Sequence, residues 1–347
     1  MTLIKLADSH ILGIVISYLF GVFILPFVIH FSEKQGLVDA PGERKIHNRQ
    51  ISRLGGIAIW LSTIITFSIL ILLSYYPSGK LLSGILLGSS MMFLLGLIDD
   101  IYGLSAKFKL VIQLTIATIV FLLGIRIETI TIPYSDPIVL SSWFSYIVTV
   151  LWLTGISNAV NFIDGLDGLA GSVVTMSAVT LGVVAVTGDT SAISALIAFI
   201  LAGSMLAFLT YNFNPAKIIM GDSGALFAGF LLATLSITGI IQAATLAFVP
   251  FFILSVPIVD IVFSSTRRIL KGKSPFIADA EHIHHKLLKA GFSQNTTVLI
   301  LAVFALIFGF FAIFASESSL WKYLLIVTIL GSIMLVLNVL AKYKKNN

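Results

Sequence analysis

The sequence predicts an all-α integral membrane protein, a polytopic bundle of about eleven transmembrane helices in a single domain over residues 1–347. Two observations support this prediction. Of the 347 residues, 58% are hydrophobic and only 11% are charged, which is too little charge for the surface of a water-soluble domain of this length. In addition, apolar runs close to the ~20 residues that a helix needs to cross a bilayer recur along the whole chain.

The expected spans follow one another without a repeat, a low-complexity tract or a linker between them. The first span is too long for a signal peptide and lacks a small-residue cleavage site. Cysteine is absent, which excludes disulfides and thiolate metal sites. We expect transmembrane helices over 11–31, 54–74, 81–98, 108–125, 142–161, 169–187, 191–211, 223–239, 242–263, 296–315 and 320–341.

Lysine and arginine in the loops set the orientation of these spans. If the C-terminal tail is cytoplasmic, the cytoplasmic segments hold 17 of the 21 Lys and Arg residues and the outer segments hold 4. The sequence therefore predicts an outer N-terminus and a cytoplasmic C-terminus. With this topology every unusual polar cluster lies on the cytoplasmic side, where ionisable groups at helix ends indicate a functional site. The basic residues are then a topology signal, and nucleic-acid binding has no support.

The most unusual stretch covers residues 155–171 and reads GISNAVNFIDGLDGLAG. It places Asn158, Asn161, Asp164 and Asp167 at every third position, which predicts one slowly rotating face of a helix. Two carboxylates and two amides make an all-oxygen surface, which suits Mg²⁺ better than zinc or copper. Helix capping is the structural alternative, but it accounts for only one of the four residues.

A second polar motif, Asp99-Asp100, closes the third expected span. The two carboxylates repel each other, which favours a proton on one of them and makes the pair a candidate for a base. Lys107 and Lys109 follow within reach and are candidates for binding phosphate. An ordinary cytoplasmic helix end remains the alternative for this motif.

Two glycine-containing motifs lie at expected helix starts. Residues 220–224 read MGDSG; no catalytic triad accompanies this serine-protease-like string, so Asp222 is either a helix cap or a metal ligand. Residues 52–56 read SRLGG, and a glycine pair at a helix start permits close approach of the backbone to a ligand.

The last motif, HIHH, brings His282, His284 and His285 together. Its spacing without cysteine fits no common structural zinc site. Beside Arg267, these histidines are candidate donors to a diphosphate, with a solvated histidine-rich loop as the alternative. On a regular helix His282 and His285 share a face, so we expect these two to contact the diphosphate or sugar and His284 to pack behind them.

Together these motifs resemble the polyprenyl-phosphate N-acetylhexosamine-1-phosphate transferases (glycosyltransferase family 4). The resemblance extends over essentially the whole chain, with Asp99-Asp100, NxxNxxDGxDGLA (158–170), MGDSG (220–224) and HIHHKL (282–287) in family order. HIHH and SRLGG look like the branch that transfers GlcNAc-1-phosphate from UDP-GlcNAc to undecaprenyl phosphate, the first membrane step of O-antigen, teichoic acid or similar glycans. The alternative within the family is the phospho-MurNAc-pentapeptide transferase of peptidoglycan synthesis.

The resemblance also implies roles for these residues. Asp222 and Asn161 would hold Mg²⁺, with Mn²⁺ as its substitute, against the diphosphate. Asp99 and Asp100 would lie near the lipid phosphate, Asp164 and Asp167 near the nucleotide. Phosphate oxygens would be bound by Lys109 and the histidines, and Asn158 and Arg267 would complete the substrate site. Many members carry an aromatic residue where this chain has Ile219, so the residue that stacks on uracil is not identified.

The resemblance further implies a bacterial plasma-membrane protein with its active site on the cytoplasmic face, where UDP-sugars are found. UDP-N-acetylhexosamine and undecaprenyl phosphate are the expected partners, and a homodimer is left open. Two other classes are less well matched. A CDP-alcohol phosphatidyltransferase would need a DGxxAR core, which is missing after Asp164. A cation-coupled transporter would need carboxylates near the bilayer midplane, where only Asp260 is a candidate.

Overall fold

The computed structural model describes residues 3–39, 51–73, 80–130, 138–187, 191–241, 249–270 and 282–317. Almost all of these residues are helical. The strands among them form two short antiparallel pairs, β1–β2 and β3–β4. The elements are α1 (Leu3–Lys34), β1 (Val38–Asp39), β2 (Ile51–Ser52), α2 (Gly55–Leu72), α3 (Lys80–Tyr102), α4 (Ala106–Leu122), β3 (Thr129–Ile130), β4 (Ile138–Val139), α5 (Ser142–Ile163), α6 (Leu169–Thr187), α7 (Ala192–Asn212), α8 (Gly221–Ser236) with a π-helical extension η1 (Ile237–Ile241), α9 (Val249–Ile253), α10 (Ser255–Leu270), α11 (Ile283–Lys289) and α12 (Gln294–Glu317).

Eight helices within the described residues are long and apolar enough to cross a membrane, which makes the chain a multi-pass, all-α membrane protein. They are α1, α2, α3, α5, α6, α7, α8 with η1, and α12. The fourth expected span corresponds to α4, which has 17 residues. The eleventh expected span, 320–341, lies outside the described residues.

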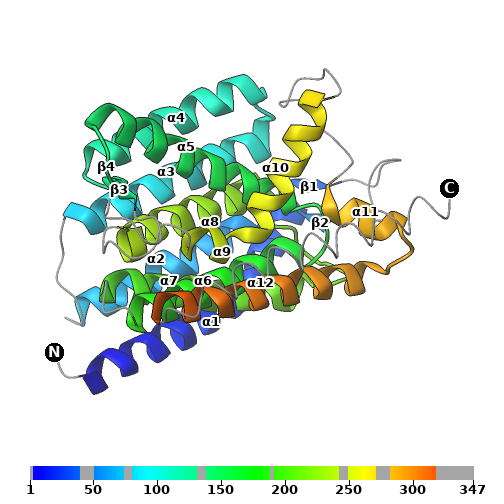
Figure 1. Cartoon of the computed structure of the whole chain (residues 1–347). Helices are drawn as coiled ribbons and strands as arrows, with labels where there is room; N and C mark the ends of the chain where they lie inside the picture. Colours follow the sequence, from blue (N-terminus) through cyan, green and yellow to red (C-terminus); the bar gives the residue numbers. More distant parts are fainter. Residues whose placement is uncertain are drawn as a thin grey trace.

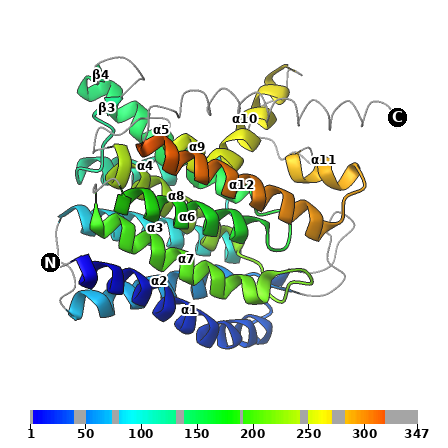
Figure 2. The same ribbon diagram turned by 60° about the horizontal axis from the view of Figure 1, so that its bottom comes forward.

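Helix α8 forms the centre of the bundle. It packs against α2, α3, α5, α6 and α7, and all of its residues from Ser223 to Ser236 are buried. Because α8 is apolar on every side, it is suited to a position surrounded by other helices rather than by lipid. By contrast, α1 and α12 lie at the edge of the bundle (Figures 1 and 2). They expose large apolar side chains such as Phe23, Phe27 and Phe310.

The start of α8 is held close to α2 through the SRLGG and MGDSG motifs. The backbone N–H groups of Gly55 and Gly56 donate to the carbonyl oxygens of Ile219 and Met220 at 3.1 and 2.9 Å. A Cβ atom on Gly56 would collide with the backbone of Gly224, so the two helices can meet only through glycine. The expectation that this glycine pair faces a ligand is therefore wrong: it faces α8.

The ninth expected span, 242–263, differs from the observed structure. Residues 242–248 lie outside the described ranges, and the chain then forms α9 and α10, which are separated at Leu254. Pro257 explains the break, because it has no N–H to donate to the carbonyl oxygen of Ile253. That oxygen accepts instead from Ser177 Oγ of α6 at 2.8 Å.

The helices alternate in direction, so that every polar motif is brought to the same end of the bundle. In Figure 1 this end lies at the right, with β1, β2 and α11, whereas the N-terminus, β3 and β4 lie at the left. The C-terminal ends of α3, α5 and α7 and the N-terminal ends of α4, α6 and α8 meet at the right-hand end. The convergence expected from the sequence is thus present in the fold.

Candidate active site

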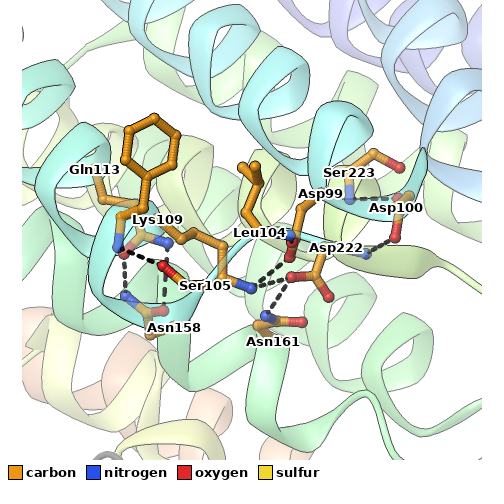
Figure 3. A network of polar contacts seen from close by, with 11 residues as sticks. Asp99, Asp100, Leu104, Ser105, Lys109, Gln113, Asn158, Asn161, Asp222 and Ser223 are labelled. Atoms are coloured by element: carbon orange, nitrogen blue, oxygen red, sulfur yellow. Dashed lines mark hydrogen bonds and ion pairs between the residues drawn. The ribbon is translucent and has the colours of Figure 1, made fainter. Parts of the chain in front are cut away.

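Lys109 lies at the centre of the polar cluster. Its ammonium group, in the first turn of α4, donates to Asp99 Oδ2 at 2.7 Å and forms a second ion pair with Asp222 Oδ2 (Figure 3). Asn161 Nδ2, from the last turn of α5, donates to the same oxygen of Asp222 at 3.3 Å. Four helices, α3, α4, α5 and α8, therefore direct a lysine, two carboxylates and an amide to one point.

Asp99 and Asp100 both lie in the last turn of α3, where the helix dipole disfavours negative charge. Hydrogen bonds to both carboxylates, and an ion pair to Asp99, offset this unfavourable interaction with the helix dipole. Asp99 Oδ1 accepts from the backbone N–H of Leu104 at 2.6 Å, so this side chain also closes the turn between α3 and α4. Both oxygens of Asp99 are engaged, one by this N–H and one by Lys109.

Asp100 faces a different direction from Asp99. Its two oxygens accept from the backbone N–H groups of Asp222 and Ser223 at 2.9 and 3.0 Å (Figure 3). These N–H groups belong to the first turn of α8 and have no partner within that helix. Asp100 therefore caps α8 from another helix and fixes the backbone of Asp222. This contact favours a positioning role over the catalytic role predicted for Asp100.

The DGLDG segment does not continue the helix that precedes it. We expected four polar residues on one helical face, but α5 ends at Ile163, so only Asn158 and Asn161 lie on it. Asp164 is the C-cap residue and Asp167 lies in the turn before α6. Gly168, with a φ of 79°, permits this turn. The three-residue spacing therefore gave a wrong prediction of where Asp164 and Asp167 lie.

Asp164 nevertheless lies among the site's negative charges. Burial, followed by the nearby carboxylates of Asp222, Asp100 and Asp167, raises the pKa of Asp164 to about 7, although a backbone hydrogen bond from Gly221 opposes the rise. Among the described residues, this cluster holds five aspartates (Asp99, Asp100, Asp164, Asp167 and Asp222) and two cations, Lys109 and Arg53, which leaves an excess of acidic groups. Such a surplus is the electrostatic condition under which a divalent cation binds.

Asp167 is held by hydrogen bonds from the segment between α7 and α8. Its side chain is buried, and its Oδ2 accepts from Asn214 Nδ2 at 3.0 Å and from the backbone N–H of Ala216 at 3.1 Å. These contacts tie the turn before α6 to the segment between α7 and α8. We therefore infer that Asp167 stabilises the end of the bundle, in contrast to the catalytic role predicted for it.

Replacing Asp167 with alanine is expected to lower the free energy of unfolding by about 1–3 kcal/mol, because two donors lose a charged acceptor. Thermal unfolding of the purified protein in detergent measures this change. Asp167→Asn keeps one acceptor oxygen and should lose less. Equal melting temperatures for wild type and Asp167→Ala would contradict the structural role.

Asn158 faces a partner that the sequence did not reveal. It forms a reciprocal amide pair with Gln113: Asn158 Nδ2 donates to Gln113 Oε1 at 2.7 Å, and Gln113 Nε2 donates to Asn158 Oδ1 at 3.3 Å (Figure 3). Gln113 is fully buried and lies one helical turn after Lys109, so the pair locks α4 to α5 beside the site. A buried amide in a membrane helix was the signal that could have identified Gln113.

The histidine segment is only partly helical. His282 precedes α11 as its N-cap residue, with a φ of −62° and a ψ of 161°. The expectation that His282 and His285 share a helical face is therefore wrong. The rings of His282 and His284 are stacked at 5.7 Å between centroids, and those of His284 and His285 are tilted at 4.3 Å. The three imidazoles form one row.

His284 links this row to the DGLDG turn. Its side chain is buried, and a Cβ atom on Gly165 would lie 2.6 Å from His284 Nε2, so glycine is needed where the two segments meet. Within the part of the chain that the structure describes, buried His284 Nε2 has no hydrogen-bond partner. Burial and the neighbouring His285 lower the pKa of His284 to about 4, so this imidazole is neutral near pH 7.

This shift predicts a pH dependence of stability. Between pH ~6.5 and ~4 the unfolded chain binds a proton at residue 284 that the folded protein does not bind, so stability is lost as the pH falls through this window. Melting temperatures at pH 7.5 and pH 5 should therefore differ more for the wild type than for His284→Leu. Parallel pH profiles of the two proteins would exclude His284 as the source.

The remaining candidate, Arg267, lies in α10, but its side chain is outside what the structure describes. Lys107 is exposed. Among the described residues, no group of three or more His, Cys, Asp or Glu side chains is arranged to hold a metal ion on its own. The available oxygen donors are those of Asp222, Asn161 and the adjacent aspartates.

The fold and this site define a multi-pass membrane protein with a cluster of carboxylate, amide and lysine side chains at one end of its bundle. A family model described as glycosyl transferase family 4 matches residues 82–240, which include the Asp99, Asn161 and Asp222 motifs. The chain belongs to this family.

Three relatives from different bacteria extend the match. The chain is 36% identical over 322 residues to a probable undecaprenyl-phosphate N-acetylglucosaminyl 1-phosphate transferase of Bacillus subtilis (strain 168), covering 92% of this chain and 88% of the relative. It is 34% identical over 305 residues to a decaprenyl-phosphate N-acetylglucosaminephosphotransferase of Mycobacterium tuberculosis (80% and 76%). It is 28% identical over 316 residues to an undecaprenyl-phosphate alpha-N-acetylglucosaminyl 1-phosphate transferase of Escherichia coli (87% and 82%).

Proposed function

We propose that this protein transfers GlcNAc-1-phosphate from UDP-GlcNAc to undecaprenyl phosphate and releases UMP, with the whole chain, 1–347, as one membrane-embedded transferase domain. The observation that carries the proposal is the convergence of Lys109, Asp99, Asp222 and Asn161 at one end of a helix bundle. Relatives that align over most of the chain bear names of this activity. The names of these relatives do not support the phospho-MurNAc-pentapeptide or transporter alternatives.

The reaction needs positioning and charge neutralisation more than covalent chemistry. An oxygen of the lipid phosphate forms a bond to the β-phosphorus of UDP-GlcNAc, and the bond from that phosphorus to the bridging oxygen breaks as UMP leaves. Lys109 supplies a fixed positive charge beside both substrate phosphates. Because a lipid phosphate is largely ionised at pH 7, Asp99 contributes mainly by orienting Lys109 rather than as a base.

The proposed cofactor is Mg²⁺, with Mn²⁺ as its substitute. Asp222 and Asn161 would hold the ion, which would neutralise the diphosphate when bound. The donor set fits this ion, since Mg²⁺ is usually held by one or two carboxylates together with substrate phosphates and waters. The excess of carboxylates around Asp164 is a second property that suits a divalent cation.

The proposal is tested by incubating the purified protein in detergent with radiolabelled UDP-GlcNAc and undecaprenyl phosphate. We expect a labelled lipid and one equivalent of UMP. A panel of other UDP-sugars then identifies the preferred N-acetylhexosamine, with the lipid product detected by mass. Uptake of a cation without lipid product would instead support a transporter.

We further propose the full topology of eleven spans, with the N-terminus outside and the site on the cytoplasmic face of the plasma membrane. Cysteines introduced at Lys80 and Ser318 should react with an impermeant reagent in intact cells, and those at Gln50 and Ser293 should not. The background is clean, because the chain has no native cysteine. Reversed labelling would overturn the topology. Cross-linking in membranes would test for a homodimer.

A further inference from the structure

The imidazole of His282 is held on three sides. The ring is stacked on Phe162, at 5.9 Å between ring centroids, and on His284, at 5.7 Å. Its Nδ1 atom is 2.7 Å from Asp260 Oδ2. Because the faces fix the plane of the ring and Asp260 fixes its rotation within that plane, the Nε2 edge has a single defined direction.

Asp260 contributes a second contact to the same segment. Its Oδ1 accepts from the backbone N–H of Ile283, the first residue of α11, at 2.8 Å. Asp260 lies in α10 and is only 3% exposed, so this carboxylate is buried with both oxygens directed at residues 282 and 283. A buried carboxylate is costly, and its partners indicate what it is for.

We propose that Asp260 is a positioning residue that orients His282 so that its Nε2 faces an anionic oxygen of the diphosphate of the sugar nucleotide, an inference that rests on the proposed function. A carboxylate at Nδ1 fixes the rotation of the ring and so the direction of its Nε2 edge. An N–H donor at Nε2 that faces a phosphate oxygen would form a hydrogen bond to a charged acceptor, which is stronger than one to a neutral acceptor. Asp260 itself need not touch the substrate.

A double-mutant cycle tests whether Asp260 acts through His282. We expect His282→Ala to lower kcat/KM for UDP-GlcNAc by about 10- to 100-fold, and Asp260→Asn by about tenfold, mainly through KM. Asparagine retains an acceptor for the Ile283 N–H, so α11 should stay in place. In the His282→Ala background, Asp260→Asn should cost less than about twofold.

A cycle with Asn158 serves as the control. The structure gives Asp260 contacts to residues 282 and 283, whereas Asn158 pairs with Gln113 of α4, so the effects of Asp260→Asn and Asn158→Ala should multiply. If the effects of Asp260→Asn and His282→Ala multiply as well, Asp260 does not act through His282 but stabilises the fold. That result would overturn the proposal.

A second measurement separates this proposal from the proposed function. The chain has six histidines, so ¹⁵N-labelled histidine gives a small NMR spectrum in which His282→Ala identifies the His282 signals. We expect Nδ1 of His282 to be protonated in the wild type, without substrate, and to lose its proton in Asp260→Asn. An unprotonated Nδ1 in the wild type would overturn the proposal even if the enzyme is active. An inactive wild type with the expected ring signals would overturn the proposed reaction instead.

Discussion

Replacing Asp222 with asparagine is expected to lower turnover by about 10²–10³-fold, equivalent to about 3–4 kcal/mol of transition-state stabilisation. Asp222 Oδ2 is where Lys109 and Asn161 meet, so the substitution removes the negative charge that holds the site's cations. Steady-state assays of UMP release over a range of Mg²⁺ concentrations measure the effect.

The fold should survive this substitution. The side chain of Asp222 is 25% exposed, in the first turn of α8, and its charge there contributes only about 0.3–1 kcal/mol through the helix dipole. Asp167→Asn is the matched control, since it makes the same chemical change at a buried position of the same end of the bundle. It should alter the melting temperature but not the Mg²⁺ dependence. Wild-type activity in Asp222→Asn at ordinary Mg²⁺ would remove Asp222 from the site.

The second large effect is expected for Lys109→Met. This change keeps much of the length of the side chain but removes the ammonium group that pairs with both Asp99 and Asp222. A phosphate-binding charge is lost, and we expect kcat/KM to fall by about 10²–10³-fold. Lys109→Arg should recover part of the activity, because it keeps the charge but not the compact geometry of the ammonium group.

Lys109→Met also has a signature that a simple loss of folding would not produce. In the proposed site the ammonium group would compete with Mg²⁺ for Asp222, so its removal should strengthen Mg²⁺ binding while turnover falls. The Mg²⁺ concentration that gives half of the residual activity should therefore be lower than in the wild type. A higher Mg²⁺ requirement would show that Lys109 supports the cation instead of competing with it.

The structure divides the aspartates of the sequence motifs by what each one touches. Asp99 and Asp222 form ion pairs with Lys109, and Asp99 also accepts the backbone N–H of Leu104. The contacts that the structure gives for Asp100 and Asp167 are instead to backbone N–H groups and, for Asp167, to the amide of Asn214. Motif membership alone cannot make this distinction, because a carboxylate that binds a cation and one that caps a helix have the same chemistry. The two groups should separate experimentally into variants that change metal dependence and variants that change stability.

The sequence by itself determined the class of protein, the positions of most helices and the motifs that gather at one end. Span length and apolar composition follow from the thickness of the bilayer, so α2, α3, α5, α6, α7 and α12 lie within a few residues of their predicted bounds. The alternation of helix direction then requires Asp99, Asn161 and Asp222 to lie at the same end, which follows from the order of the chain alone.

Only the tertiary structure decided how the side chains at that end are used. The end of α5 at Ile163 and the start of α11 after His282 placed Asp164, Asp167 and the histidines off the helical faces that their spacing predicted. Gln113, Asp260 and the contact between Gly165 and His284 involve partners 45, 22 and 119 residues away in the chain. Periodicity reports only on neighbours three or four residues apart, so contacts between separate helices are fixed by packing and hydrogen bonding in the folded bundle.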